Sequence, residues 1–236
     1  MRHEYDKTTI AARLQTENIA PNQDIDMNEI YFGTVSKYLD GASNLLDVGT
    51  GNGFVLSEII KRNAGLNTRL YGIDSSESMV SLARKNLAGK ADIFLADASK
   101  LPFDDGSFDI VVAKNVTRIN AEEISRVLRV GGVFIFREYG RGKGLCEIAS
   151  LFPGRIIRQR DPQFYVSNLT SAGLTIEKLE SFRVKRSYNS VEELITIVKS
   201  YPFIDGLSDS DVKLIREHCR DAVVTSDPFL LVCRKE

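Results

Sequence analysis

Histidine and cysteine are scarce in this chain, and each scarcity argues against a class of protein. The 236 residues include only 2 histidines and 3 cysteines. Two histidines argue against a metal site of clustered imidazoles, so no metal is expected. Cys146, Cys219 and Cys233 lie far apart, form no C-x-x-C pair and are odd in number. This usage predicts a reducing, cytoplasmic setting without a disulfide framework.

Excess charge and long apolar runs are also missing. The net charge is -1 and the sequence pI is about 6.2, which disfavours a dedicated nucleic-acid binder while leaving local basic patches open. The N-terminal MRHEYDKTTI has no apolar core for a signal peptide. No segment approaches the ~18 apolar residues of a membrane span. We therefore expect a soluble protein with no membrane partner.

The length and composition suit a single globular domain. The chain is 43% hydrophobic and 27% charged, and a domain of this size buries roughly 70–75% of its unfolded surface. We interpret residues 1–40 as an N-terminal helical cap, with Ile30, Tyr31, Val35 and Leu39 in a helical stripe. Residues 44–138 form the patterned core, and residues 139–236 contribute helices and closing strands.

The stretch LLDVGTGNG is the most informative feature of what is present. Its apolar run ends at Asp47, and glycines follow at Gly49, Gly51 and Gly53. Such glycines let the backbone turn sharply and approach a ligand, while the helix from Phe54 points free N–H groups at it. The dinucleotide fingerprint G-x-G-x-x-G is only half matched. The pattern predicts a nucleotide-binding turn that is not the usual NAD turn.

Further strands follow this turn, and polar residues stand where each one ends. LYGID ends at Asp74, 23 residues after Gly51, about where a carboxylate accepts hydrogen bonds from ribose hydroxyls. ADIFLAD ends at Asp97, and FDIVVAKNV comes after an FDDGS turn. Helical stretches such as VLSEIIKRN and MVSLARKNL separate the strands, which is typical of βαβ units and a parallel sheet. An adenosine-type ligand is expected.

From residue 44 to 138 this succession resembles the class I S-adenosylmethionine-dependent methyltransferases, in the small-molecule, methyltransferase type 11 or UbiE-like branch. LPFDDGSFD and RVLRVGGVF also look like that family's stretches before its fourth and fifth strands. The resemblance implies an α/β, Rossmann-like fold. Its sheet would have seven mostly parallel strands with an antiparallel last strand, helices on both faces, and N-terminal and late helical lid insertions.

The resemblance also implies a cofactor site for S-adenosylmethionine, with S-adenosylhomocysteine as product. In the family, residues matching Asp47, Gly49 and Gly51 line the methionine part, and the acid matching Asp74 holds the ribose. Asp97 and the backbone of Ala98 would hold the adenine amino edge. The full expected set is Asp47, Gly49, Thr50, Gly51, Asp74, Ser75, Asp97, Ala98 and Asn115. For Asn115, a turn-stabilising role is an equal alternative.

The tail after Tyr139 is less clearly patterned. After the turn GRGKG we expect short helical pieces over 145–172, a strand over LTIEKLESFRVKRSY, two helices from about Val191 to His218, and the closing strand PFLLVCRKE. The resemblance makes SVEELITIVKSYPF a lid over the acceptor pocket. Core packing is the stronger alternative for Leu194, Ile197 and Val198. For Tyr201 and Phe203, core packing and a lid role are about equal alternatives.

The expected chemistry needs no dedicated base, because aligning the acceptor with the methyl group and leaving sulfur lowers the barrier by roughly 7–11 kcal/mol. If the acceptor must lose a proton, the catalytic candidates are His3, Tyr5, Glu138 and Tyr139. Tyr5 could also close the pocket over the sulfonium, although a packing role is an equal alternative. His218 is interpreted as a surface or packing residue.

Two basic runs follow in the tail. They are Arg155, Arg158 and Arg160, and then Arg183, Lys185 and Arg186. Either run could hold a carboxylate or phosphate of the acceptor, and a solvated charged face is the favoured alternative. Strand alternation predicts that Phe182, Val184 and Arg186 share one face, opposite Arg183, Lys185 and Ser187.

The leading hypothesis is methyl transfer from S-adenosylmethionine to a nucleophilic atom of a small-molecule metabolite or natural-product intermediate by in-line displacement. Oxygen, nitrogen, carbon and sulfur acceptors stay open, as does the oligomeric state. A methyltransferase of a macromolecule, such as tRNA, rRNA or a peptide, is one alternative. A non-catalytic S-adenosylmethionine-binding protein is another. The glycine spacing, with Asp47 and Asp97, argues against an NAD-using protein.

Overall fold

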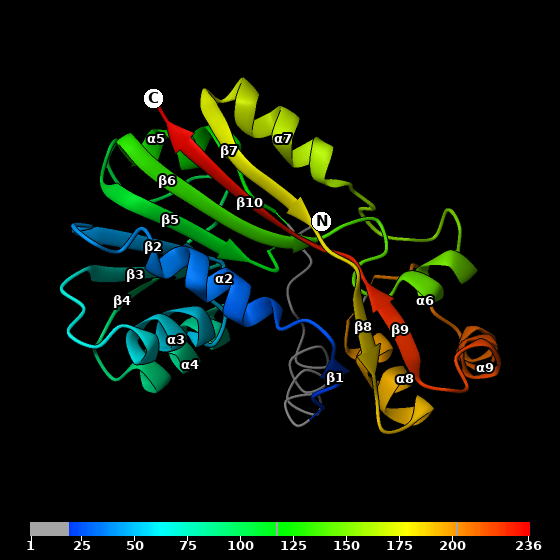
Figure 1. The fold of residues 1–236 in the computed structure, drawn as a ribbon. Coiled ribbons are helices and arrows are strands. Elements are labelled where there is room, and N and C mark those ends of the chain that lie inside the picture. The colour runs from blue at the N-terminus through cyan, green and yellow to red at the C-terminus, as the bar shows by residue number, and fades with distance from the viewer. Residues whose placement is uncertain (1–18, 117, 202) are drawn as a thin grey trace. The chain divides into compact units, whose positions relative to one another are not determined.

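The computed structural model describes residues 19–116, 118–201 and 203–236 (Figure 1). The chain divides into two compact units, each built from separate stretches of sequence. The large unit contains residues 27–138, 162–180 and 229–236. The small unit contains, among the described residues, 19–26, 139–161, 181–201 and 203–228. That the whole chain acts as one domain stays a prediction.

The large unit is built on a seven-stranded sheet of order β4-β3-β2-β5-β6-β10-β7. Its strands are β2 (Asn44–Val48), β3 (Arg69–Asp74), β4 (Asp92–Leu95), β5 (Phe108–Lys114), β6 (Leu128–Tyr139), β7 (Leu174–Ser181) and β10 (Pro228–Lys235). The pairs β3–β4, β2–β3, β2–β5 and β5–β6 are parallel. β10 runs opposite to its neighbours β6 and β7 (Figure 1). The expected Rossmann-like sheet with an antiparallel last strand is confirmed.

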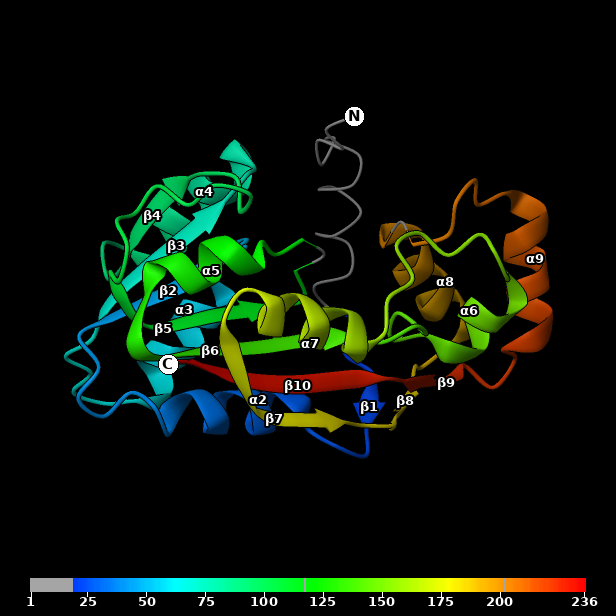
Figure 2. The ribbon, with the colours of Figure 1, turned by 90° about the horizontal axis from the view of Figure 1, so that it is seen from above.

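Helices cover both faces of this sheet, as expected for parallel βαβ units. They are α2 (Met27–Ser36), α3 (Phe54–Arg62), α4 (Glu77–Leu87), α5 (Ala121–Val127) and α7 (Pro162–Ser171). α3 contacts α2 and α4, whereas α5 contacts α7. α5 and α7 lie on the opposite face of the sheet from α2 (Figure 2). The Asn120 side chain accepts the backbone N–H groups of Glu122 and Glu123 and so begins α5.

The central strands are nearly continuous apolar runs because helices bury both of their faces. β5 contributes Ile110, Val111, Val112 and Ala113, all 1% exposed or less. At or near the carboxyl ends of two of these strands, Asp47 and Asp74 interrupt the apolar run. In parallel strands these ends meet at one edge of the sheet, which is where ligands bind in open α/β folds.

The small unit has its own sheet and its own apolar core. β1 (Asn22–Gln23), β8 (Val184–Ser187) and β9 (Val223–Ser226) form an antiparallel sheet of order β1-β8-β9. Among the residues that the structure describes, the helices that accompany it are α6 (Cys146–Leu151), α8 (Val191–Ser200) and α9 (Asp209–His218). Leu194, Val198 and Phe203 are buried in its core, and Ile197 and Tyr201 pack against that core while partly buried. A lid role for this segment stays a prediction.

The expectation of a single strand over LTIEKLESFRVKRSY is wrong. The segment makes two strands, β7 in the seven-stranded sheet and β8 in the three-stranded sheet. β9 and β10 divide in the same way at Asp227, and the Phe182 N–H donates to the Pro228 carbonyl at 2.8 Å beside this break. Because β8 pairs with β9, the interruption at Asp227 on one strand accompanies an interruption at Phe182 on the other.

None of the helices within the described part of the chain is long and apolar enough to cross a membrane.

Candidate functional site

The glycine turn joins β2 to α3 at the carboxyl edge of the seven-stranded sheet. Gly49, Gly51 and Gly53 have φ values of 74°, 55° and 84°, a left-handed region that disfavours any residue with a Cβ. A Cβ on Gly49 would also lie 2.7 Å from a Val116 methyl carbon. The Gly51 N–H donates to Asp74 Oδ2 at 2.9 Å, which ties the turn to the end of β3.

Asp47 is the most unusual group at this turn. It is 1% exposed, and neither carboxylate oxygen has a hydrogen-bond partner among the described residues. Burial raises the pKa of Asp47 to about 7, although the nearby Thr50 hydroxyl and Lys114 ammonium favour its ionised form. The Thr50 hydroxyl lies close without meeting hydrogen-bond geometry. A buried carboxylate without partners is costly, so this position suits a cationic or hydrogen-bond-donating ligand.

Tyr31 of α2 faces the same region, and the site residues expected from the sequence did not include it. Its side chain is 0% exposed, and its hydroxyl has no hydrogen-bond partner among the described residues. Burial raises the pKa of Tyr31 well above its ordinary value, and the Asp47 carboxylate raises it further. The helical stripe over residues 30–39 was visible in the sequence, but periodicity cannot separate a packing tyrosine from one beside a ligand.

Asp74 holds two backbone segments at once. Its Oδ2 accepts the Gly51 N–H, and its Oδ1 accepts the Ser76 N–H at 2.9 Å, just before α4 begins. Ser75 is exposed beside it. Each carboxylate oxygen can accept more than one hydrogen bond, so these contacts leave Asp74 able to accept from ligand hydroxyls.

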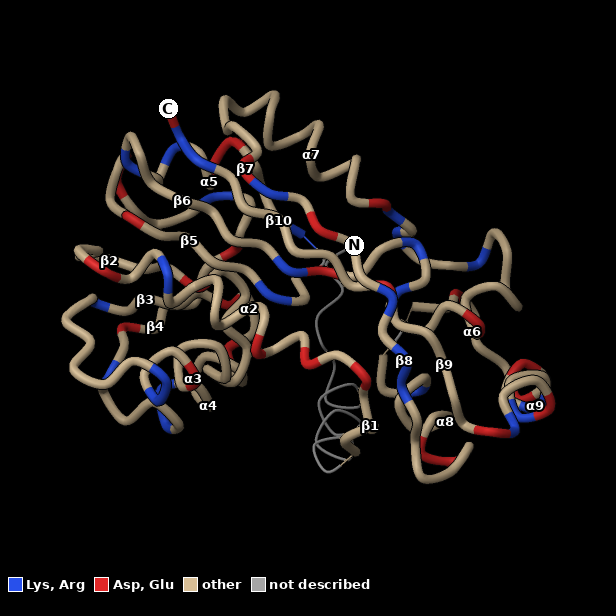
Figure 3. The backbone as a smooth tube through the Cα atoms, viewed as in Figure 1, with Lys and Arg blue, Asp and Glu red and all other residues tan. Residues whose placement is uncertain are grey.

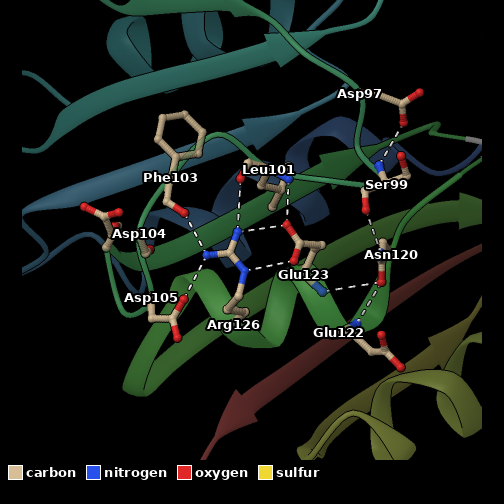
Figure 4. A network of polar contacts seen from close by, with 11 residues as sticks. Asp97, Ser99, Leu101, Phe103, Asp104, Asp105, Asn120, Glu122, Glu123 and Arg126 are labelled. Atoms are coloured by element: carbon tan, nitrogen blue, oxygen red, sulfur yellow. Dashed lines mark hydrogen bonds and ion pairs between the residues drawn. The ribbon is translucent and has the colours of Figure 1, made fainter.

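Asp97 and Ala98 follow β4 on a loop that α5 holds in place (Figure 4). Asp97 Oδ1 accepts the Ser99 N–H at 2.8 Å, and Asn120 Nδ2 donates to the Ser99 carbonyl at 2.9 Å. Arg126 completes the network with hydrogen bonds to the carbonyls of Leu101 and Phe103 and to the carboxylates of Asp105 and Glu123.

The hydrogen bonds from Arg126 lower the pKa of Glu123 to about 2. Figure 4 shows the Arg126 side chain reaching from α5 to the loop. The network therefore fixes the loop on which the expected adenine contacts stand.

Asn115 stands at the end of β5 with a φ of 57°, a left-handed conformation that Asn tolerates better than most residues. Its backbone N–H donates to the Arg137 carbonyl at 2.9 Å, and its side-chain oxygen accepts from Arg137 Nη1. Arg137 is 3% exposed. Lys114 lies 5.0 Å from the centroid of the Phe54 ring and favours the charged form of Asp47. Arg137 was not expected from the sequence, because an arginine inside an apolar strand carries no motif.

Of the four catalytic candidates, the structure describes two. Glu138 is 2% exposed at the end of β6, and Tyr139 follows it half-buried. His3 and Tyr5 lie outside the described residues. His218 is exposed at the end of α9, where its Nδ1 lies 2.9 Å from the Leu214 carbonyl oxygen, so its interpretation as a surface residue is confirmed.

The two basic runs differ in what they contact. Arg155 forms a bidentate pair with Asp211, at 3.0 and 2.8 Å, and also donates to the carbonyls of Asp205 and Gly206. This pairing lowers the pKa of Asp211. Arg183 and Lys185 are exposed, whereas Arg186 is largely covered, so the expected alternation is confirmed. Figure 3 shows Lys and Arg along β8.

Two further features bear on where chemistry can occur. An open hollow lies between Ser36–Asn44 and Asn63–Arg69, at the amino ends of β2 and β3. This is the sheet edge opposite the glycine turn, so the hollow is not the expected cofactor site. Across the described ranges, no group of three or more His, Cys, Asp or Glu side chains could hold a metal ion.

Comparison with known proteins identifies the domain. Residues 46–136 match the family model described as "Methyltransferase domain". The ubiquinone/menaquinone biosynthesis C-methyltransferase UbiE of Geobacter sp. strain M21 is 32% identical over 142 residues, 56% of this chain and 60% of that protein. The chain thus spans less than two thirds of the length of this curated relative.

Solved structures show the same fold at low identity. The YcgJ protein of Bacillus subtilis has a TM-score of 0.65 at 15% identity, covering 88% of this chain and 99% of that one. A geranyl diphosphate C-methyltransferase of Streptomyces coelicolor A3(2), solved with Mg²⁺, geranyl diphosphate and S-adenosylhomocysteine, has a TM-score of 0.56 at 15% identity. That likeness covers 88% of this chain and 77% of that one.

Residues 46–136 therefore form a methyltransferase domain, which resembles the UbiE-like branch of the class I enzymes and whose cofactor is S-adenosylmethionine.

Proposed function

We propose that this protein transfers a methyl group from S-adenosylmethionine to a nucleophilic atom of a small-molecule acceptor. The observation that carries the proposal is the buried Asp47 carboxylate without a hydrogen-bond partner, at the head of a glycine turn that Asp74 holds in place. The name of the Geobacter relative, a quinone C-methyltransferase, supports a small-molecule acceptor. The family match ends at residue 136, so the acceptor's identity is not carried over from it.

The residues present fit the cofactor. Asp47 would face the amino group of its methionine part, because a cation there removes the cost of an ionised, buried carboxylate. Asp74 would accept from ribose hydroxyls while keeping the Gly51 contact. Ser75, Asp97 and Ala98 would contact the adenosine, and Gly49, Thr50, Gly51 and Asn115 would line the rest. When bound, the cofactor supplies an electrophilic methyl group on a sulfonium.

The protein's own contribution to the reaction is binding, alignment and exclusion of water. Holding two reactants in line supplies roughly 7–11 kcal/mol without a base. Glu138 and Tyr139 stay the candidates for accepting a proton, should the acceptor need to lose one. The cytoplasmic setting is likewise a proposal that rests on the cysteine usage.

The first test is calorimetric titration with S-adenosylhomocysteine, with NAD in parallel. We expect S-adenosylhomocysteine to bind with micromolar affinity and NAD to give no heat of binding. Methyl incorporation from labelled S-adenosylmethionine is then measured with small-molecule acceptors and with bulk tRNA. NAD binding without product binding would contradict the cofactor assignment, and incorporation into tRNA alone would contradict the small-molecule acceptor.

A further inference from the structure

Arg186 places a cation on the buried face of the small unit's sheet. Val184 and Tyr188 share its side of the strand by alternation, and they are 0% and 8% exposed. Across the ladder, Arg186 pairs with Val224, which is 1% exposed. Apolar side chains of α6, α8 and α9 complete this core. A guanidinium on such a face needs compensating partners.

The partners that Arg186 has are phenols and not carboxylates. Its Nη2 donates to the Tyr139 hydroxyl at 3.1 Å, and its guanidinium carbon lies 5.5 Å from the Tyr139 ring centroid. The Tyr188 phenol also interacts with it. Its Nε–H is buried without a hydrogen-bond partner, and no carboxylate of the described residues forms an ion pair with it. The positive charge of Arg186 is thus stabilised by the dipoles of the two phenols and by no carboxylate. The Nε–H is left as a donor without an acceptor.

A second unused polar group lies on the same face. Ser226 is 0% exposed, and its hydroxyl has no hydrogen-bond partner among the described residues. The register pairs Ser226 with Val184, and Val224 with Arg186. Ser226 is therefore a diagonal neighbour of Arg186, at a spacing that long side chains bridge. Two orphaned donors on one buried face are uncommon in a packed core.

The loop after Tyr139 is fixed against this face. Asp227 accepts the Gly142 and Gly144 N–H groups at 2.6 and 2.8 Å, and its carbonyl accepts the Gly140 N–H at 2.9 Å. A Cβ on Gly144 would lie 2.9 Å from the Tyr139 ring. The ring therefore packs directly on the Gly144 backbone, which holds the phenol beside Arg186 before any ligand arrives.

We propose that Arg186, Ser226, Tyr139 and Tyr188 bind the carboxylate of a small organic acid. The guanidinium Nε–H and the Ser226 hydroxyl are donors without partners, and a carboxylate has two oxygens that accept from both. One guanidinium charge matches a monoanion better than a phosphate dianion. Arg186 keeps partial solvent exposure, so a ligand could approach its guanidinium, whereas the Arg186 Nε–H and the Ser226 hydroxyl are both buried.

The surrounding side chains are aromatic and aliphatic, which suits an apolar remainder on the acid. The inference rests on the proposed function only in taking this acid to be the methyl acceptor.

The test is a titration of the whole protein with benzoate, with benzamide as the neutral, isosteric control. Nitrogen-15 NMR follows the Arg186 Nε–H resonance, assigned as the one lost in Arg186→Lys. Benzoate is expected to shift this resonance and benzamide to leave it in place. Losing a charge-assisted hydrogen bond should weaken benzoate binding about ten- to hundredfold in Arg186→Lys. Ser226→Ala should weaken it less.

Arg183→Lys is the matched control. Because Arg183 is exposed on the opposite side of the same segment, this substitution should leave benzoate binding unchanged. Equal weakening by both substitutions, or an unmoved Arg186 resonance in the unsubstituted protein, would overturn the proposal. Tighter binding of phenyl phosphate would overturn the choice of a carboxylate. S-adenosylhomocysteine binding is measured on each variant and should not change. Its absence from the unsubstituted protein would contradict the proposed function while leaving the benzoate result standing.

Discussion

The two units use buried polar groups in different ways. In the large unit, Asp47 and Tyr31 are orphaned at the carboxyl edge of a parallel sheet, where ligands of open α/β folds bind. In the small unit, the Arg186 Nε–H and the Ser226 hydroxyl have no hydrogen-bond partner on the inner face of an antiparallel sheet. The first site would receive a cationic ligand group and the second an anionic one. The two proposals together predict that cofactor and acceptor are recognised by opposite charges.

Asp74→Ala should have the largest effect on the large unit's site. The substitution removes the acceptor expected for ribose and also the bond that positions the Gly51 N–H. We expect S-adenosylhomocysteine affinity, measured by calorimetry, to fall about ten- to hundredfold. Asp92 is an exposed acid at the amino end of β4, away from the glycine turn, so Asp92→Ala should leave S-adenosylhomocysteine affinity unchanged. Unchanged affinity in Asp74→Ala would remove this residue from the site.

Asp47 should make cofactor binding depend on pH. Its pKa is about 7, and a cationic ligand group favours the ionised form, so binding releases a proton when the pH lies below that value. S-adenosylhomocysteine affinity should therefore fall by up to about tenfold per pH unit below pH 7. Asp47→Asn should bind more weakly, with a flatter pH profile. A steep profile in Asp47→Asn would assign the proton to another group.

The same shift sets the sign of a stability effect. Because burial raises the pKa of Asp47, the folded protein holds a proton that the unfolded chain releases. The contribution of Asp47 to the free energy of unfolding is therefore present below about pH 4 and lost as the pH rises to about 7. Denaturant unfolding without ligand should show Asp47→Asn gaining stability relative to the unsubstituted protein over this range.

The large unit was largely predictable from sequence because its signals are local. An apolar run, a glycine turn and a helical stripe each span a few neighbouring residues, so β2, β3 and β5 and the helices between them could be read directly. The small unit depends on pairings between distant segments. β1 pairs with β8 more than 160 positions along, as in the bond from the Lys185 N–H to Asp24 Oδ1. No local pattern encodes such a partner.

The site divides in the same way. Asp47, Asp74 and Asp97 end apolar runs and were visible as such. Tyr31, Arg137 and Arg126 depend on contacts with residues outside their own sequence segment, as when Arg126 donates a hydrogen bond to the Phe103 carbonyl. Arg186 stood in a basic run, but it differs from Arg183 in being largely buried. Strand alternation predicted that the two residues lie on opposite faces, and only the pairing of β8 with β9 shows that the face of Arg186 is covered.

Arg126→Met should have a smaller effect, spread over the loop that follows Asp97. Arg126 is 30% exposed in its side chain, so solvent screens its pair with Glu123 and the loss of unfolding free energy should be about 1–2 kcal/mol. Glu123 has a lowered pKa of about 2, so this contribution is present above about pH 4 and lost as the pH falls toward 2. Urea unfolding at pH 7 and pH 3 measures the difference, which should shrink at the lower pH.

Arg155→Met should disturb the small unit alone and gives the smallest effect. Arg155 joins the segment after α6 to the start of α9 through Asp211 and two carbonyls, none of which belongs to the large unit. The expected result is a small drop in Tm and faster proteolysis within residues 139–161 and 181–228, with S-adenosylhomocysteine affinity unchanged. Arg141→Met, which breaks the exposed pair with Asp161, is the matched control and should leave both Tm and proteolysis unaffected. If Arg155→Met instead weakened product binding as much as Asp74→Ala, the two units would not be separable in function, and the contrast between a cofactor unit and an acceptor unit would fail.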